Sequence, residues 1–191
     1  GIVTVTGAGS KWTNSGSLDV GFNGNGTLSV QNGGEVSNAK GAIAAFAGSN
    51  GNATVTGSGS KWTNSGDLEI GRVGTGALNV QNGGEVTNIN GLIGLVSSGN
   101  GTVTVAGTGS KWTNSGELIV GDSGNGTLSV QNGGEVTNTN GFIGDFSSGN
   151  GTVTVTGTGS KWTNSGLLII GNFGNGTLNI ESGGEVTNTF G

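Results

Sequence analysis

The octapeptide GSKWTNSG occupies residues 9–16 and returns unchanged at residues 59–66, 109–116 and 159–166. A catalytic motif is needed once in a domain, whereas an identical motif every 50 residues indicates that the chain passes repeatedly through one physical environment. The repeats hold their spacing without an insertion, so we expect residues 1–191 to form a single repeat segment. Its blocks are 1–50, 51–100, 101–150 and 151–191.

Each block also resembles itself at half its length. The stretch GTVTVAGTGSKWTNSGELIVGDSGN at 101–125 aligns with GTLSVQNGGEVTNTNGFIGDFSSGN at 126–150, so the unit is about 25 residues and occurs in two variants. The alignment matches Val103 with Leu128, Trp112 with Val136 and Val120 with Ile143, at offsets of 25, 24 and 23.

Each unit contains three short strand-like pieces, which read TVTV, KWTN and ELIV in the first variant of the third block. The first two pieces alternate polar and apolar residues, as half-buried strands do, and glycine, asparagine and serine between the pieces favour turns. Such units predict an all-β fold: a right-handed parallel β-helix (a solenoid) with about 25 residues per coil and two coil variants per 50-residue repeat. The hand follows from the general preference of parallel crossovers. A β-propeller is the alternative, although its blades need four longer strands.

In a stacked coil each sequence position becomes a column, and the apolar column of the second strand alternates Trp with Val. We expect this column to point inward, because a bulky side chain above a small one lets neighbouring coils interdigitate. The alternative is an exposed aromatic platform that stacks on sugars. The column reads Trp12, Val36, Trp62, Val86, Trp112, Val136, Trp162 and Val186.

An asparagine lies two residues after each Trp or Val. Asparagine tolerates left-handed backbone at a corner, and stacked amides can donate and accept hydrogen bonds along the axis. We therefore expect a structural amide ladder in this column. Its members are Asn14, Asn38, Asn64, Asn88, Asn114, Asn138, Asn164 and Asn188.

The column before Trp and Val alternates lysine and glutamate. We expect an exposed charge ladder that disfavours slippage by one coil, because a slip would place like charges together. The column reads Lys11, Glu35, Lys61, Glu85, Lys111, Glu135, Lys161 and Glu185.

The composition excludes several classes of site. The chain has no Cys and no His, so the usual zinc, copper and haem ligands are missing. A net charge of −5 with evenly spread Lys and Glu leaves no basic surface for nucleic acid. No apolar run reaches membrane-spanning length, and no signal peptide is seen. We expect no cofactor, no bound metal and no nucleic-acid partner; Asp122 and Asp145 lack the recurring partners of a calcium site.

The third strand varies most between blocks, so its variable positions are the candidate contact face of the protein. Some of them are apolar in later coils where earlier coils carry Asp or Glu, and exposed apolar patches often mark partner sites. The alternative is drift on a tolerant surface. The candidate contact residues are Ser17, Asp19, Asp67, Glu69, Glu117, Ile119, Leu167 and Ile169.

The stretches VAGTGSKWTNSGELIVG at 105–121 and GNGTLSVQNGGEVTN at 124–138 resemble the glycine-rich repeats of passenger domains in type V secretion autotransporters. Similar repeats occur in PEP-CTERM surface proteins. The resemblance covers essentially all 191 residues, although lysine precedes Trp where a small or polar residue is expected. It implies a secreted β-helical stalk on the surface of a Gram-negative bacterium. The sequence begins and stops within the repeat pattern, which we interpret as a fragment of a longer array whose barrel or anchor lies outside residues 1–191.

These observations predict a structural and adhesive surface stalk without catalysis, which self-associates or binds glycans or proteins of a host or matrix. Ice binding is an alternative because outward threonines recur in TVT stretches of the first strand, at Thr4–Thr6, Thr54–Thr56 and Thr152–Thr154, although Ser29 and Gln31 interrupt those columns. A glycan-binding β-helix is another alternative. A polysaccharide-active enzyme is disfavoured because carboxylates are evenly distributed rather than clustered.

Overall fold

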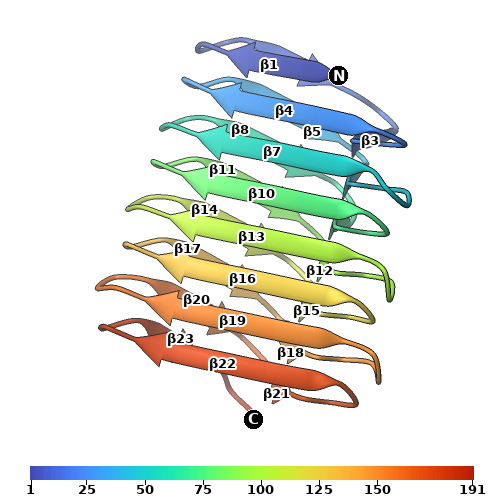
Figure 1. The fold of residues 1–191 in the computed structure, drawn as a ribbon. Coiled ribbons are helices and arrows are strands. Elements are labelled where there is room, and N and C mark those ends of the chain that lie inside the picture. The colour runs from blue at the N-terminus through green and yellow to red at the C-terminus, as the bar shows by residue number, and fades with distance from the viewer.

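The computed structural model describes residues 1–191, and its strands form three parallel sheets. Successive strands belong to different sheets, so each complete coil contributes one strand to each sheet and the coils stack along one axis (Figure 1). In Figure 1 the front strands run from right to left while the chain descends from the N-terminal end. Seen along the axis from that end, the chain therefore winds clockwise as it recedes, which is a right-handed winding. The prediction of a right-handed parallel β-helix is confirmed. No helix long and apolar enough to cross a membrane is present.

The first sheet faces the viewer in Figure 1 and contains the TVTV-type strands. Its eight strands are β1 (Ile2–Thr6), β4 (Asn25–Gln31), β7 (Asn50–Thr56), β10 (Thr75–Gln81), β13 (Asn100–Ala106), β16 (Asn125–Gln131), β19 (Asn150–Thr156) and β22 (Asn175–Glu181).

The second sheet contains the KWTN and EVTN strands. Its eight strands are β2 (Lys11–Thr13), β5 (Glu35–Asn38), β8 (Lys61–Asn64), β11 (Glu85–Asn88), β14 (Lys111–Asn114), β17 (Glu135–Asn138), β20 (Lys161–Asn164) and β23 (Glu185–Thr187).

The third sheet closes each coil. Its seven strands are β3 (Ser17–Val20), β6 (Lys40–Ile43), β9 (Leu68–Ile70), β12 (Gly91–Ile93), β15 (Glu117–Val120), β18 (Asn140–Ile143) and β21 (Leu168–Ile170).

The register between coils follows the predicted alignment. Val103 pairs with Leu128, Trp112 with Val136 and Val120 with Ile143, so the offsets of 25, 24 and 23 are confirmed. The offset between the two coil variants falls from 25 to 23 residues along the coil. The last turn of the second variant is two residues longer, which restores the offset to 25. Like positions therefore lie over like positions along the whole axis.

The interior of the solenoid is one continuous apolar core of 29 buried residues. It is built from alternate positions of all three sheets, such as Leu78, Trp62 and Ile70, which are 0% exposed. Where the third sheet meets the first, the backbones approach so closely that a Cβ on Gly101 would overlap the carbonyl oxygen of Ile70. Glycine is required at this corner for lack of space.

Candidate functional site

Each interior tryptophan begins a chain of hydrogen bonds between coils. Nε1 of Trp62 donates to Oδ1 of Asn38 at 2.7 Å, and Nδ2 of Asn38 donates to Oδ1 of Asn64 at 2.7 Å. Nδ2 of Asn64 then donates to the carbonyl oxygen of Thr87 at 3.4 Å. The same bonds recur from the other two interior tryptophans. They satisfy polar groups that would otherwise be buried without a partner.

The tryptophan column points inward, as predicted. Trp62, Trp112 and Trp162 are 0% exposed, whereas Trp12 in the first coil is half-buried and packs against the core from its open end. Each indole leans toward the preceding coil, where a glycine makes room for it: a Cβ on Gly91 would lie 2.7 Å from Cζ2 of Trp112. This glycine alternates with leucine in the third sheet. A coil with Trp in the second sheet carries Leu in the third, and a coil with Val in the second sheet carries Gly in the third.

The asparagine column bonds along the axis, but it does not form the continuous amide ladder that we expected. Side-chain amides bond to each other only at every second contact between coils, as Asn38 does with Asn64. At the contacts between, the asparagine donates to a backbone carbonyl, as Asn64 does to Thr87. The expectation of left-handed backbone in this column is also wrong. Positive φ occurs instead at Asn32, Asn82 and Asn132, because they form the tight turn after a first-sheet strand, while the column residues end extended strands or lie just beyond them.

The outer charge column is in the predicted register, with each lysine paired to a glutamate one coil on. The Nζ–Oε2 distances are 2.9 Å for Lys11–Glu35 and 3.2 Å for Lys61–Glu85, and two further pairs repeat the contact. Lys61 also faces Glu35 in the backbone register. Because these side chains are about half exposed, each pair contributes little to stability.

The candidate contact residues fall into two neighbouring outward columns of the third sheet. Ser17 and Asp19 in the first coil are exposed, and Asp67, Glu117 and Leu167 are half-buried at the edge where the sheet begins. The amide of Asn90 donates to Oδ1 of Asp67 at 2.9 Å. These residues lie on one face, and binding through them stays a prediction.

The second column carries an apolar stripe, which we define as Leu92, Ile119, Phe142 and Ile169. Ile119 pairs with Leu92 on one side and with Phe142 on the other, and Phe142 pairs with Ile169. Ile119 is only 9% exposed because its neighbours in the stripe cover it, while the other three residues are half-buried. The expectation of an exposed contact residue is therefore wrong for Ile119.

Glu69 continues this column toward the N-terminus and is also buried, at 4% exposure. Its carboxylate lies 2.6 Å from Nζ of Lys40 and 3.4 Å from Nε of Arg72. Two cations from neighbouring positions cover it, so the expectation of an exposed contact residue is wrong here too. Glu69 instead marks the N-terminal boundary of the apolar stripe.

Two acids lie on adjacent coils at the turn after the third sheet. Burial and the nearby charge of Asp145 raise the pKa of Asp122 to about 6, although a hydrogen bond from Ser123 opposes this shift. Nδ2 of Asn172, one coil further, donates to Oδ1 of Asp145 at 2.9 Å. No group of three or more acidic side chains converges anywhere in the chain, so this pair has no third carboxylate with which to hold a metal ion.

Leu92 and Phe142 also belong to the contact face, although they were not among the predicted contact residues. Both come from the second coil variant, whereas the predicted contact residues all come from the first. The predicted offset of 23 residues would have placed Phe142 beside Ile119. The same offset separates Asp122 from Asp145.

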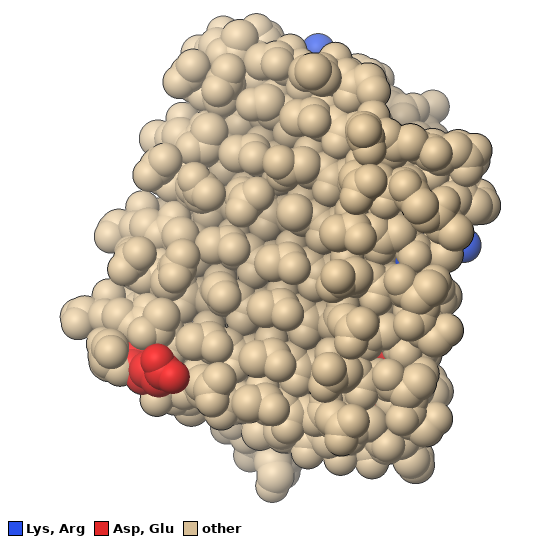
Figure 2. All heavy atoms as spheres, viewed as in Figure 1, with Lys and Arg blue, Asp and Glu red and all other residues tan.

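The outer face of the first sheet differs from the third in that it is almost uncharged, as the tan surface in Figure 2 shows. Its strands contain one charged residue, Glu181. In this sheet Thr4 pairs with Ser29, and Thr6 pairs with Gln31. The threonine columns are therefore interrupted in the observed register, by the smaller Ser29 in one column and by the longer Gln31 in the other.

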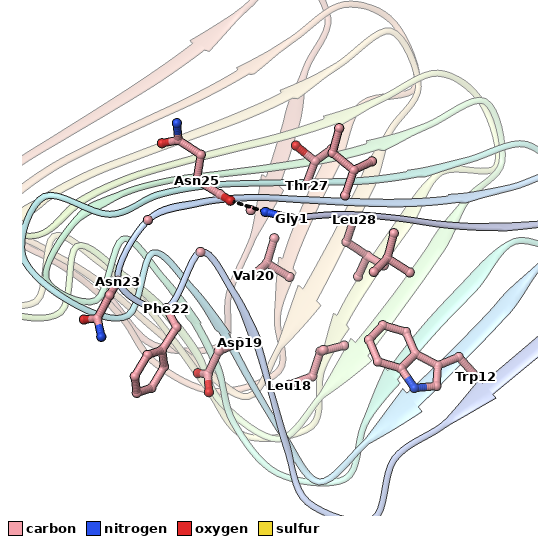
Figure 3. Close-up of a pocket in the computed structure, with 15 residues that line it drawn as sticks. Gly1, Trp12, Leu18, Asp19, Val20, Phe22, Asn23, Asn25, Thr27 and Leu28 are labelled. Carbon is pink, nitrogen blue, oxygen red and sulfur yellow. Dashed lines mark hydrogen bonds between the residues drawn. The ribbon is translucent and has the colours of Figure 1, made fainter.

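The largest hollow of the molecule is its open N-terminal end, with a volume of about 460 Å³. Trp12, Leu18 and Leu28 line it, and Figure 3 shows Phe22 and Asn23 on the far side, away from the indole. The opposite end has a second hollow of about 380 Å³ that includes Leu168, Val186 and Gly191. Both hollows are the exposed core of a terminal coil.

Comparison of the chain with known protein families, with curated proteins and with solved structures found no match.

Proposed function

We propose that this chain is a rigid segment of a secreted surface stalk that makes adhesive contacts through its third sheet and performs no catalysis. The apolar stripe is the observation that supports this proposal. The inward columns repeat every second coil, whereas the outward column changes from Asp19, Ala42 and Glu69 to the four apolar residues of the stripe. Apolar side chains gathered on an outer sheet face are typical of a protein contact surface.

The solenoid form supports the stalk. Coils stacked at about 4.8 Å extend a rod in proportion to the number of repeats, without any new fold being required. The resemblance of the repeats to autotransporter passenger domains supports display on the outside of a Gram-negative cell. The contact would be self-association, or binding to glycans or proteins of a host or matrix.

The proposal is tested with cells that display the chain, by measuring cell aggregation and binding to a glycan array. We expect activity in at least one assay, and its loss when Leu92 and Phe142 are both replaced by Glu. The matched control replaces Thr104 and Thr154 by Glu, because these residues are also half-buried and outward but belong to the first sheet. Loss of activity in the control alone would contradict the assignment of the face. Two blank assays would leave a passive spacer as the better account.

The ice-binding alternative depends on the first sheet, where a flat threonine array would be needed. Gln31 lies between Thr6 and Thr56 in the observed register, so a longer side chain interrupts the array at every second coil. We expect no thermal hysteresis from the purified chain. Measurable hysteresis would favour the first sheet as the functional face.

A further inference from the structure

A notch interrupts the outer face of the third sheet in the second coil. Its volume is about 260 Å³, and its floor is formed by Ala42 in β6 and Ala45 in the turn after β6. Two coils further along, the same two columns carry Leu92 and Leu95. Only the second coil has a small residue in both columns, so the notch occurs once in a molecule whose other features repeat.

Larger side chains form the two walls of the notch. Asp19 and Phe22 form the wall in the first coil, and Figure 3 shows both side chains pointing away from the indole of Trp12. Glu69 and Arg72 form the opposite wall in the third coil. The notch is therefore one coil wide and is open to solvent on the outside of the sheet.

Two aromatic rings meet at the turn that borders the notch. The ring centroids of Phe22 and Phe46 are 4.6 Å apart, and the ring planes are inclined by 63°. Phe22 is 51% exposed and Phe46 is 43% exposed, so aromatic surface remains open beside the alanine floor. The face of an aromatic ring is electron-rich and attracts polarised C–H groups, such as those on one face of a sugar ring.

The only two cations outside the outer charge column of the second sheet also line the notch. The chain has six Lys and Arg residues; four belong to that column, and the other two are Lys40 and Arg72. Both are half-buried, and they share the single buried carboxylate of Glu69. These three side chains therefore have an excess of one positive charge.

The hydrogen bonds of this charged cluster are not satisfied by its own members. Nζ of Lys40 lies 2.6 Å from Oε1 of Glu69, but Oε2 receives no hydrogen bond, and Nε of Arg72 lies 3.4 Å from it. Nε is the guanidinium atom in this contact, so the two terminal nitrogens of Arg72 are left to bind another group. A guanidinium binds a carboxylate through two parallel hydrogen bonds. The cluster therefore favours a ligand carboxylate beside Arg72.

We propose that the notch binds one acidic sugar unit, a pyranose that carries a carboxylate. The carboxylate binds Arg72 and Lys40, and the C–H face of the ring covers the alanine floor beside the aromatic rings. The hydroxyl groups at the other end of the sugar donate to the carboxylate of Asp19. Glu69 is a positioning residue, because it holds the two cations at the wall of the notch without contacting the sugar.

The size of the notch and the separation of its charges agree with a ligand of this class. Asp19 and Glu69 belong to one column and are two coils apart, about 10 Å at the backbone, so the ligand carboxylate lies away from Asp19. Pockets for drug-sized ligands have volumes of about 300–1,000 Å³. A notch of about 260 Å³ is smaller, and it suits a single sugar unit.

This binding site goes beyond the adhesive role of the apolar stripe and does not depend on it. The residues that bind the carboxylate and form the floor lie in the second and third coils, and each of these coils has a neighbour on both sides. The stripe begins at Leu92, on the far side of Glu69 from the notch.

The test titrates the purified, isotopically labelled chain with methyl glucuronide and follows the backbone amides by NMR. We expect saturable shifts centred on Phe46 and Arg72. Methyl glucoside has a hydroxymethyl group in place of the carboxylate, and acetate has the carboxylate without the ring. Each of these should bind at least about tenfold more weakly, because each lacks one of the two contacts.

Two pairs of variants locate the site. Ala42→Leu fills the floor without straining the sheet, since Leu92 occupies the equivalent position, and it should abolish the shifts. Ile119→Leu places leucine in the same column outside the notch and should bind as the unchanged chain does. Arg72→Lys keeps the charge but removes the paired donors, so binding should weaken about tenfold. Lys61→Gln removes a cation of the outer charge column and should leave binding unchanged.

The absence of saturable shifts would overturn the proposal. So would equal binding of the glucuronide and the glucoside, equal binding of acetate, or binding that Ala42→Leu leaves unchanged. Phe142→Glu changes the apolar stripe away from the notch and should leave the titration unchanged. Failure of the sugar site and failure of the adhesive role are therefore distinguishable.

Discussion

The second and third sheets share one chain path and one parallel register, yet their sequences are constrained differently. In the second sheet, an inward Trp needs an asparagine and a glycine from the preceding coil, so three positions must be kept together. In the third sheet, the outward column needs only neighbours that pack beside it, and it ranges from Asp19 to Phe142. Buried hydrogen bonds between coils restrict which residues a column can contain. A column on the outside of the solenoid has no such restriction, so its residues can change and form a contact surface.

The largest effect should come from removing an indole in the second sheet. Trp112→Ala removes a fully buried side chain and leaves a cavity, so we expect a loss of about 3–5 kcal/mol in the free energy of unfolding. Ile119→Ala in the apolar stripe should cost about 1–2 kcal/mol, because the residue packs on the outside of the sheet. Denaturant unfolding measures both. Equal losses would break the distinction between the two sheets.

The hydrogen-bond chain gives the next largest effect. Asn138→Ala removes the acceptor of Trp162 and the donor to Asn164, and we expect a loss of about 2–3 kcal/mol because two buried polar groups lose their partner. Asn14→Ala is the matched control, since its amide bonds only within the exposed first coil. A cost for Asn14→Ala as large as that for Asn138→Ala would show that the bonds between coils add nothing.

The acid pair beyond the third sheet gives a stability that depends on pH. Because folding raises the pKa of Asp122 from 3.8 to about 6, the folded state is favoured most below pH 4 and loses this advantage as pH rises through 6. Asp122→Asn should therefore stabilise the chain by roughly 2 kcal/mol at pH 8 and have little effect at pH 3.5.

Melting temperatures of Asp122→Asn across that pH range test the sign of the effect. Asp19→Asn, at an exposed position of the third sheet, is the control and should change stability little. If Asp122→Asn destabilised the chain at pH 8, the carboxylate would be making a favourable contact that the structure does not contain.

The smallest effect should come from the outer charges of the second sheet. Lys111→Ala removes one half-exposed ion pair with Glu135, so we expect less than about 1 kcal/mol. The same denaturant unfolding measures it. A loss as large as that of Asn138→Ala would mean that the outer column, rather than the inner one, holds the register of the second sheet.

The sequence was sufficient to predict the columns, because a repeat without insertions determines which residues stack. It did not predict the direction in which the indoles lean, since an alignment gives positions but not side-chain conformations. The role of Gly91 beside Trp112 and the pairing of alternate asparagines are seen only in the structure. Burial of Glu69 was missed because its cover comes from Lys40 and Arg72, which are not part of any repeating pattern.

The stacking of successive coils is tested most directly by distances between spin labels on the first sheet. The chain has no cysteine, so Thr27→Cys can be combined with Thr127→Cys or with Thr177→Cys and labelled specifically. These exposed positions share one column and are separated by four and six coils. In samples diluted with unlabelled chain, we predict distances of about 19 Å and about 29 Å, a rise of about 4.8 Å per coil. Two equal distances, as around the ring of a propeller, would contradict the account.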